Sequence, residues 1–184
     1  LSVLYYRISN FFQSQSFQSP DELKLIYQVQ NADLSTLFNI MASAPFAIGK
    51  WYDCKLTALV FKDGSSSDNW FGNAFKNSQW AWSIRANNTF TLCQRPKLSL
   101  SVDGFYRTKT IQGAWNLSSN WAVNSALKCA FADGRAVLEL TANDIFESRM
   151  PQIYSRLAGQ NMHTDINFYR RGIELTFTYK FKGY

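Results

Sequence analysis

Strict alternation of apolar and polar residues near the end of the chain is the feature that most constrains its fold. The alternation holds at every step over nine positions: Ile173, Glu174, Leu175, Thr176, Phe177, Thr178, Tyr179, Lys180 and Phe181. A β-strand turns successive side chains to opposite faces, so a period of two predicts a strand with one apolar and one polar face. The apolar face of such a strand must be covered by a protein core or by lipid.

Seven further segments show comparable alternation, which gives about eight predicted strands. They cover residues 1–9, 34–46, 51–61, 79–93, 97–107, 120–131, 135–143 and 167–181. In the first of them we expect the apolar side to be formed by Leu4, Tyr6 and Ile8. Only residues 145–159 could hold a helical turn, and Pro151 interrupts that stretch. The sequence therefore predicts an all-β, antiparallel fold, with residues 1–184 as a single domain.

The links between the predicted strands alternate in length. Short turns are expected around residues 48–50, 94–96 and 132–134, whereas residues 10–33, 62–78 and 144–166 form long links and residues 108–119 an intermediate one. Short turns at one end and long loops at the other are typical of an up-and-down transmembrane β-barrel. A soluble sandwich does not need this asymmetry, although alternation alone is compatible with one.

The aromatic content gives the membrane interpretation further support. Aromatic residues make up 16% of the chain, yet the mean hydropathy is −0.23, a combination that fits strands with only one oily face. No stretch approaches the roughly 18 apolar residues of a transmembrane helix. Many aromatics fall near predicted strand ends, where a barrel carries its interfacial girdle. The predicted girdle consists of Trp51, Tyr52, Trp80, Trp82, Tyr106, Trp121, Phe168 and Tyr169.

Charge and cysteine content exclude several other classes of protein. The net charge is +6, but the basic residues form no run and no RNA-binding signature, so no nucleic-acid partner is expected. Cys54, Cys93 and Cys129 are odd in number and far apart, which gives neither a complete disulfide framework nor a zinc motif. The chain begins at Leu1 without a signal sequence, and we expect it to be a processed chain or a fragment.

The sequence gives no support for enzymatic chemistry or for a bound cofactor. The single histidine, His163, lies near Asp165 in a predicted loop, but no GxSxG motif supplies an activated nucleophile. No glycine-rich phosphate loop is present. Residues 62–69 carry two aspartates and several hydroxyls, yet their spacing does not match a calcium loop, so a flexible external loop is expected there. We therefore predict no catalytic residue, no metal site and no cofactor.

Several landmarks resemble one family of membrane proteins. The last strand matches the assembly signal of bacterial outer-membrane barrels at Arg170, Gly172, Leu175 and Phe177, and it continues with Tyr179 and Phe181. Before it come "SAPFAIGKWYD", "LSLSVDGFYRTKTIQG" and "FADGRAVLELTANDIFES", in that order. Together they resemble the C-terminal part of an outer-membrane β-barrel family of Bacteroidota that is related to TonB-dependent receptors.

The resemblance implies a role as part of a larger wall in the bacterial outer membrane. Members of that family have about 22 strands around a plug, so eight strands would be the closing portion of the barrel. The implied partners are outer-membrane lipid, the rest of the parent barrel and its plug, the barrel-assembly machinery, a surface lipoprotein lid, and TonB through the parent. The parent would import a bulky nutrient. Two alternatives stay open: a stand-alone eight-stranded barrel with a structural or adhesive role, and a soluble β-sandwich binding module.

Overall fold

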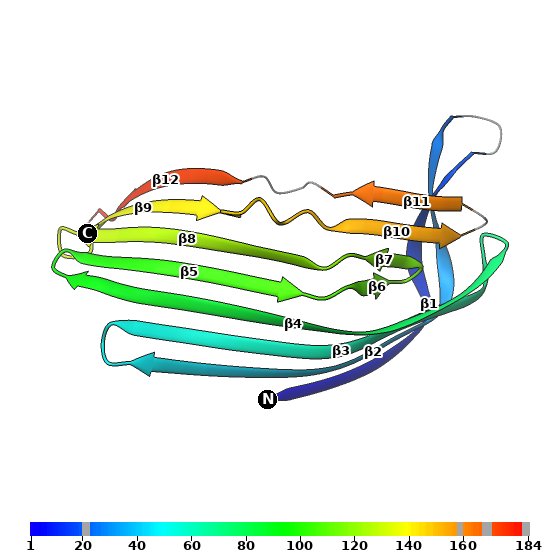
Figure 1. Cartoon of the computed structure of the whole chain (residues 1–184), viewed down its shortest axis with the longest axis horizontal. Helices are drawn as coiled ribbons and strands as arrows, with labels where there is room; N and C mark the ends of the chain where they lie inside the picture. Colours follow the sequence, from blue (N-terminus) through cyan, green and yellow to red (C-terminus); the bar gives the residue numbers. More distant parts are fainter. Residues whose placement is uncertain (20–22, 158–159, 167–170, 182–184) are drawn as a thin grey trace.

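The computed structural model describes residues 1–19, 23–157, 160–166 and 171–181, and every regular element within these ranges is a β-strand (Figure 1). No helix in this part of the chain has the length and apolar character needed to span a membrane. The strands are β1 (Ser2–Gln18), β2 (Leu25–Ile48), β3 (Tyr52–Trp70), β4 (Asn73–Gln94), β5 (Lys97–Arg107), β6 (Thr110–Gln112), β7 (Trp115–Leu117), β8 (Asn120–Phe131), β9 (Ala136–Asn143), β10 (Gln152–Leu157), β11 (Gln160–Asp165) and β12 (Gly172–Tyr179).

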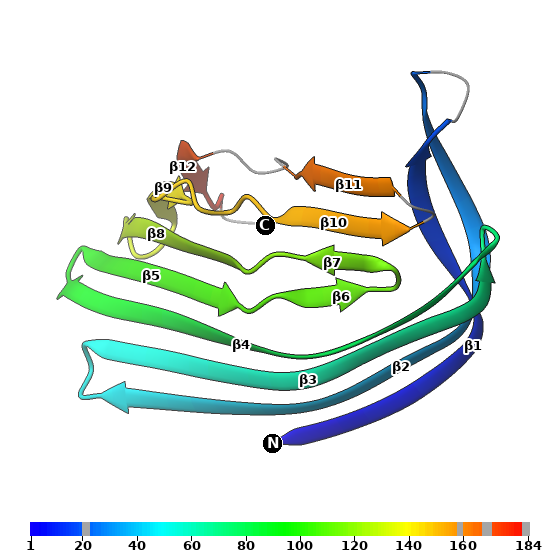
Figure 2. The ribbon, with the colours of Figure 1, turned by 45° about the vertical axis from the view of Figure 1, so that its right-hand side comes forward.

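Eight long strands form one antiparallel sheet in the order β1-β2-β3-β4-β5-β8-β9-β12. Each strand pairs with its neighbour along the chain, apart from the short strands inserted between β5 and β8 and between β9 and β12. The sheet curves into an open trough, with β1 and β12 at its two edges (Figures 1 and 2). The predicted all-β, antiparallel, up-and-down arrangement of eight main strands is confirmed.

The two ends of the trough differ. One end, here called the short-turn end, carries the tight connections β2–β3, β4–β5 and β8–β9 (Figure 1). At the opposite end, here called the hairpin end, the strands extend further and β6, β7, β10 and β11 form a second antiparallel sheet in the order β11-β10-β7-β6. This outer sheet was not predicted, because its strands lie within the links at 108–119 and 144–166.

The link predicted at residues 62–78 is a β-hairpin, so the expectation of a flexible loop at residues 62–69 is wrong. Its residues continue β3 and β4 and stay paired across the hairpin up to Trp70 opposite Asn73. Phe71 and Gly72 form the tip with φ angles of 49° and 80°. Positive φ at both central residues is the requirement of a type I′ turn, which suits the twist of a two-residue hairpin. The serine-rich stretch therefore forms strand, because the ladder continues through it.

The link at residues 10–33 is also mostly strand, since β1 reaches Gln18 and β2 begins at Leu25. The described part of residues 145–159, the one stretch that could have held a helical turn, contains no helix: a turn over residues 144–147 is followed by β10. By contrast, β5 and β8 have the bounds that the alternation predicted.

The pairing register aligns the apolar residues of the eight strands on one continuous face. Across the middle of the sheet, for example, Leu100 pairs with Leu127, Leu127 with Leu140, and Leu140 with Leu175. The expected apolar side of β1 is wrong, because Val3 and Tyr5 pair with the apolar positions of β2. Because β1 carries apolar residues on both faces, only its pairing register with β2 determines which of them lie on the apolar face of the sheet. The residues on its other face are Leu4, Tyr6 and Ile8.

Most of the buried residues lie towards the hairpin end rather than in the single-layered sheet. Trp70 and Ala32 are fully buried there, and Ile111 and Ser67 are nearly so. A one-layer sheet leaves its apolar face uncovered: Leu175 and Phe177 of β12, for example, are 66% and 61% exposed. The trough thus has a packed region at one end and an apolar face that needs an external apolar medium.

Candidate functional site

Four of the predicted girdle aromatics lie on the apolar face towards the hairpin end. The ring centroids of Trp82 and Tyr106 are 5.2 Å apart. Trp80 meets an aromatic ring of β2 edge-on at 6.2 Å, and the Lys62 ammonium lies 5.7 Å from the centroid of the same indole. Trp121 lies beside Phe146, at 5.8 Å between centroids. These side chains form a row of amphipathic rings across β4, β5 and β8.

The other two described girdle residues, Trp51 and Tyr52, lie at the short-turn end. Tyr52 packs against Phe90 at 4.9 Å and against Phe46 at 6.0 Å between ring centroids. Along β4, the step from Trp82 to Phe90 is about 26 Å long at roughly 3.3 Å per residue, before any tilt of the strand is considered. That length is similar to the apolar band of outer-membrane barrels. The contact of these two rows with lipid interfaces stays a prediction, and Phe168 and Tyr169 lie outside the described residues.

Asn88, a polar side chain on the apolar face, is hydrogen-bonded through both its oxygen and its nitrogen. Asn88 accepts a hydrogen bond from the Tyr52 hydroxyl at 2.8 Å, and its own amide donates to the carbonyl of Val102 at 2.9 Å. An unpaired amide in hydrocarbon would cost several kcal/mol, on the order of a lost hydrogen bond in an apolar medium. These bonds make Asn88 compatible with an apolar surrounding.

The residues proposed as an assembly signal lie on β12 at the edge of the sheet. Gly172 begins the strand, and Leu175, Phe177 and Tyr179 follow on its apolar face. Phe181 lies just beyond the end of the strand and is 84% exposed, while Arg170 lies outside the described residues. The edge of β12 that faces away from β9 carries no partner strand among the described residues. Recognition of this segment by an assembly factor stays a prediction.

The opposite face of the sheet is polar, as the alternation predicted. Lys128 and Glu139 form a cross-strand ion pair at 3.7 Å, and Asn87 donates to Asp103 at 3.0 Å. Small hydroxyl residues fill much of the remaining face, for example Ser43 and Thr57, whose hydroxyls are 3.1 Å apart. This face can border an aqueous lumen.

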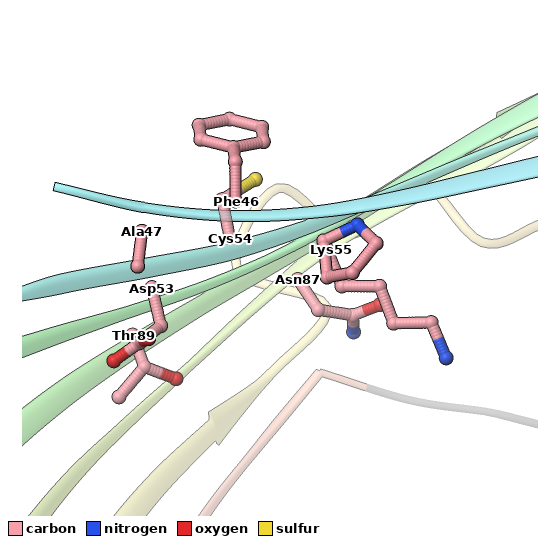
Figure 3. Close-up of a pocket in the computed structure, with 8 residues that line it drawn as sticks. Phe46, Ala47, Asp53, Cys54, Lys55, Asn87 and Thr89 are labelled. Carbon is pink, nitrogen blue, oxygen red and sulfur yellow. The ribbon is translucent and has the colours of Figure 1, made fainter.

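A hollow beside β2 and β3 illustrates the division between the faces. Figure 3 shows Phe46 and Cys54 on one side of the sheet and Asp53 and Thr89 on the other. The hollow has a volume of about 500 Å³ and is lined by residues of both faces. Because a single-layered sheet separates these residues, they do not converge on one ligand.

At the hairpin end, three side-chain amides from two strands, β1 and β4, bind the backbone in and beside the β6–β7 hairpin. Gln79 donates to the carbonyl of Lys109 at 3.0 Å, and Asn77 donates to that of Gly113 at 3.3 Å. Gln13 of β1 donates to the neighbouring carbonyl of Gln112 at 3.1 Å. The outer sheet is thereby fastened to β1 and β4 through side chains instead of a regular ladder.

The turn after β9 is built around the carboxylate of Asp144, which is only 3% exposed. Oδ1 accepts from the backbone N–H of Ser148 at 3.0 Å and from its hydroxyl at 3.1 Å, and Oδ2 accepts from the N–H of Arg149 at 3.0 Å. Burial alone would raise the pKa of Asp144, but these hydrogen bonds and the Arg149 charge hold it below its usual value. The turn also places Phe146 against Trp121.

A hollow between β4 and the outer sheet has a volume of about 650 Å³. Its lining combines two cationic side chains, one aromatic ring, amides and hydroxyls. The lining residues are Gln79, Lys109, Thr110, Asn116, Leu117, Ser118, Ser119, Gln152, Tyr154 and Arg156. Sequence reasoning missed this site, because all of these residues except Gln79 lie in segments expected to be loops.

The single histidine, His163, lies on β11 of the outer sheet. His163 stacks on Tyr154 at 4.7 Å between ring centroids, and its Nε2 lies 3.3 Å from Asp165. Within the described ranges, no group of three or more histidine, cysteine, aspartate or glutamate side chains could hold a metal ion. The three cysteines are free and lie in β3, β4 and β8.

Comparison with known proteins gives one match. The sequence model of a family described as "Outer membrane protein beta-barrel family" matches residues 1–179. No curated protein and no solved structure matches the chain.

Proposed function

Because the chain belongs to the outer membrane protein beta-barrel family and is accordingly a protein of the bacterial outer membrane, we propose that it forms one side of the wall of a TonB-dependent-receptor-like barrel. In this role it separates lipid from a lumen through which a bulky nutrient is imported. The proposed role is that of a scaffold and a lumen lining, not of an enzyme.

The observation that carries this proposal is the open sheet. Its outermost strands, β1 and β12, lie at opposite edges, so each leaves one row of backbone N–H and C=O groups without a partner strand among the described residues. Unpaired backbone groups are too costly in the hydrocarbon region, and only closed barrels avoid them. A wider barrel, in which further strands pair with β1 and β12, satisfies both edges.

The polar face supports a wide barrel rather than a narrow one. In eight-stranded barrels the interior is just wide enough for side chains to fill it. Here, many inward residues are short: Ser99, Ser101, Thr141 and Thr176 all lie on the polar face. Short side chains leave a free lumen, which a parent barrel would fill with its plug.

The two ends of the trough fit the usual orientation of such barrels. Short turns face the periplasm and long hairpins the outside, which would place the outer sheet on the cell surface. We extend the proposal to the partners of the parent barrel: the assembly machinery at β12, a surface lipoprotein lid at the hairpin end, and TonB through the parent. A source in Bacteroidota belongs to the same proposal.

The direct test is the denatured mass of the native polypeptide in outer-membrane extracts, detected with an antibody against residues 172–181. A mass several times the 21.1 kDa of this chain is expected. A native polypeptide of about 21.1 kDa would overturn the proposed parentage.

The specific rival is a small barrel closed by pairing of β1 with β12, with a structural or adhesive role. Disulfide scanning in a background without the native cysteines separates the two, because a disulfide requires Cα atoms about 4.4–6.8 Å apart. Cysteines at Val3 and Ile40, which pair in the register, serve as the positive control. Cysteines at Tyr5 combined with successive positions of β12 should not cross-link. Efficient cross-linking there would establish the small closed barrel instead.

A further inference from the structure

We propose that the hollow between β4 and the outer sheet, lined by Lys109 and Arg156, binds a sugar unit that carries a carboxylate or phosphate group. The inference deepens the proposed uptake role, since it names the class of ligand that the wall would meet at its hairpin end. A volume of about 650 Å³ is within the range of small-molecule sites, about 300–1,000 Å³.

The charge of the lining favours an anion. Lys109 and Arg156 are both exposed, and in the described part of the chain neither makes an ion pair. The described residues that line the hollow include no carboxylate. Asp165 and Asp63, which accept hydrogen bonds from the lining residues Gln152 at 2.9 Å and Thr110 at 3.1 Å, are not themselves lining residues. An arginine and a lysine with free donors suit carboxylate or phosphate oxygens.

An aromatic ring supplies the flat surface that a sugar ring needs. Tyr154 is 40% exposed, and one face of its ring stacks on His163 with an interplanar angle of 7°. The register places Asn116 of β7 on the other side of Tyr154. The second face of the ring is therefore turned towards β7 and the hollow. Tyrosine combines such an apolar face with a polar tip, and here the tip is fixed by a hydrogen bond to Gln152.

The amides around the ring are held in defined orientations. Gln79 is fixed by its bond to the carbonyl of Lys109, and Gln152 by its bond to Asp165. Asn116 accepts from Asn77 at 3.5 Å through its oxygen, which leaves its NH₂ group to donate. Donors of this kind match the hydroxyl and carboxylate oxygens of a sugar acid. A ring platform, oriented amides and two cations together point to an anionic saccharide.

Two sources could present this chemistry at the cell surface: a soluble acidic oligosaccharide, or the anionic sugars of lipopolysaccharide. The shared chemistry is a pyranose ring with a negative group, and the test below distinguishes the sources. Binding is measured on the whole protein in detergent micelles, so it does not depend on transport. A protein that binds the sugar but imports nothing would contradict the uptake role alone.

The experiment measures binding of trigalacturonate by isothermal titration calorimetry, with its methyl ester as the neutral control. The variants are Arg156→Gln, Lys109→Gln and Tyr154→Ala. Arg135→Gln is the matched control, because Arg135 lies in a short turn at the other end of the trough. Arg156→Gln should weaken binding of trigalacturonate at least about tenfold, as expected for loss of a charge-assisted hydrogen bond. Tyr154→Ala should weaken the acid and the ester alike, and Arg135→Gln should change neither.

Three results would overturn the proposal. Equal affinity for the acid and the ester would remove the role of charge. Equal loss in Arg156→Gln and Arg135→Gln would show an unspecific effect of net charge. Absence of binding of both trigalacturonate and purified lipopolysaccharide to the folded wild type would leave the hollow without the proposed ligand, whereas Arg156-dependent binding of lipopolysaccharide alone would identify lipopolysaccharide as the source of the sugar.

Discussion

Replacing Asp144 by alanine should lower the free energy of unfolding by about 3 kcal/mol. The carboxylate satisfies the backbone N–H groups of Ser148 and Arg149, both at 3.0 Å. Each buried donor left without a partner costs about 1–3 kcal/mol, and the turn borders solvent, so the lower half of that range applies to each. The Ser148 hydroxyl adds little, because it also donates to the carbonyl of Trp121. Asp144 has a φ of 47°, and alanine tolerates this region less well than aspartate, which contributes about 1 kcal/mol.

Two further variants separate these contributions. Asp133→Ala is the matched control, since Asp133 lies in a short turn with a similar φ of 55° and is exposed. It should lose only the backbone part, about 1 kcal/mol. Asp144→Asn retains one acceptor and the backbone preference, so its loss should be about 1–1.5 kcal/mol. The measurement is guanidinium unfolding of the whole protein in lipid vesicles, followed by tryptophan fluorescence.

The pH dependence supplies an independent check. The pKa of Asp144 is held below its usual value in the folded protein, so its ionised form stabilises the fold. This contribution is fully present above the ordinary aspartate pKa of about 4, and is lost as the pH falls through the lower pKa of the folded state. The difference between wild type and Asp144→Asn should therefore shrink on acidification. Equal losses in Asp144→Ala and Asp133→Ala, or a difference independent of pH, would refute the role of the carboxylate.

Three other substitutions test the assignment of faces and contacts. Leu140→Lys puts a charge on the apolar face and should lower the free energy of unfolding in vesicles by about 2–4 kcal/mol. Thr141→Lys puts the same charge on the polar face and should lower it by less than about 1 kcal/mol. Equal losses would contradict the lipid-facing assignment. Gly113→Ala should destabilise the protein more than Gly134→Ala in the same unfolding assay. Both glycines have positive φ, but a Cβ at Gly113 would lie 2.0 Å from the side-chain oxygen of Gln13, whereas no atom lies within 4 Å of a Cβ at Gly134. Lys128→Ala removes a half-exposed cross-strand ion pair and should change stability by less than about 1 kcal/mol; a larger loss would show that the lumen around it is dry.

The part of the fold that borders lipid could be predicted because its chemistry imposes a period of two. Segments such as 97–107 and 120–131 alternate throughout, and the bounds of β5 and β8 agree with them. The register carries the same signal from strand to strand. The prediction from alternation was wrong at β1, because this strand has apolar residues on both faces and Val3 and Tyr5 lie on the face that was expected to be polar.

Beyond the apolar band, strands lose the signal that identifies them. In residues 62–69, strand β3 is built from lysine, aspartate, glycine, serine and asparagine, because neither face has to meet lipid. The outer sheet has the same difficulty: β6 and β7 are each three residues long, which is too short for any period to show. The candidate sugar site lies almost entirely in these segments. Its residues come together only through contacts such as that of Gln79 with Lys109, which no local pattern encodes.

The packed region at the hairpin end has a consequence for the order of assembly. Its hairpins carry charges such as Lys62, Asp63, Asp68 and Lys76, and in the proposed orientation they must cross the bilayer to reach the cell surface. The outer sheet is bound by Gln13 of β1 and by Gln79 of β4, which belong to different hairpins, so these contacts can form only after both hairpins have crossed. The most polar part of the molecule would thus pack last, after the membrane-spanning strands have inserted.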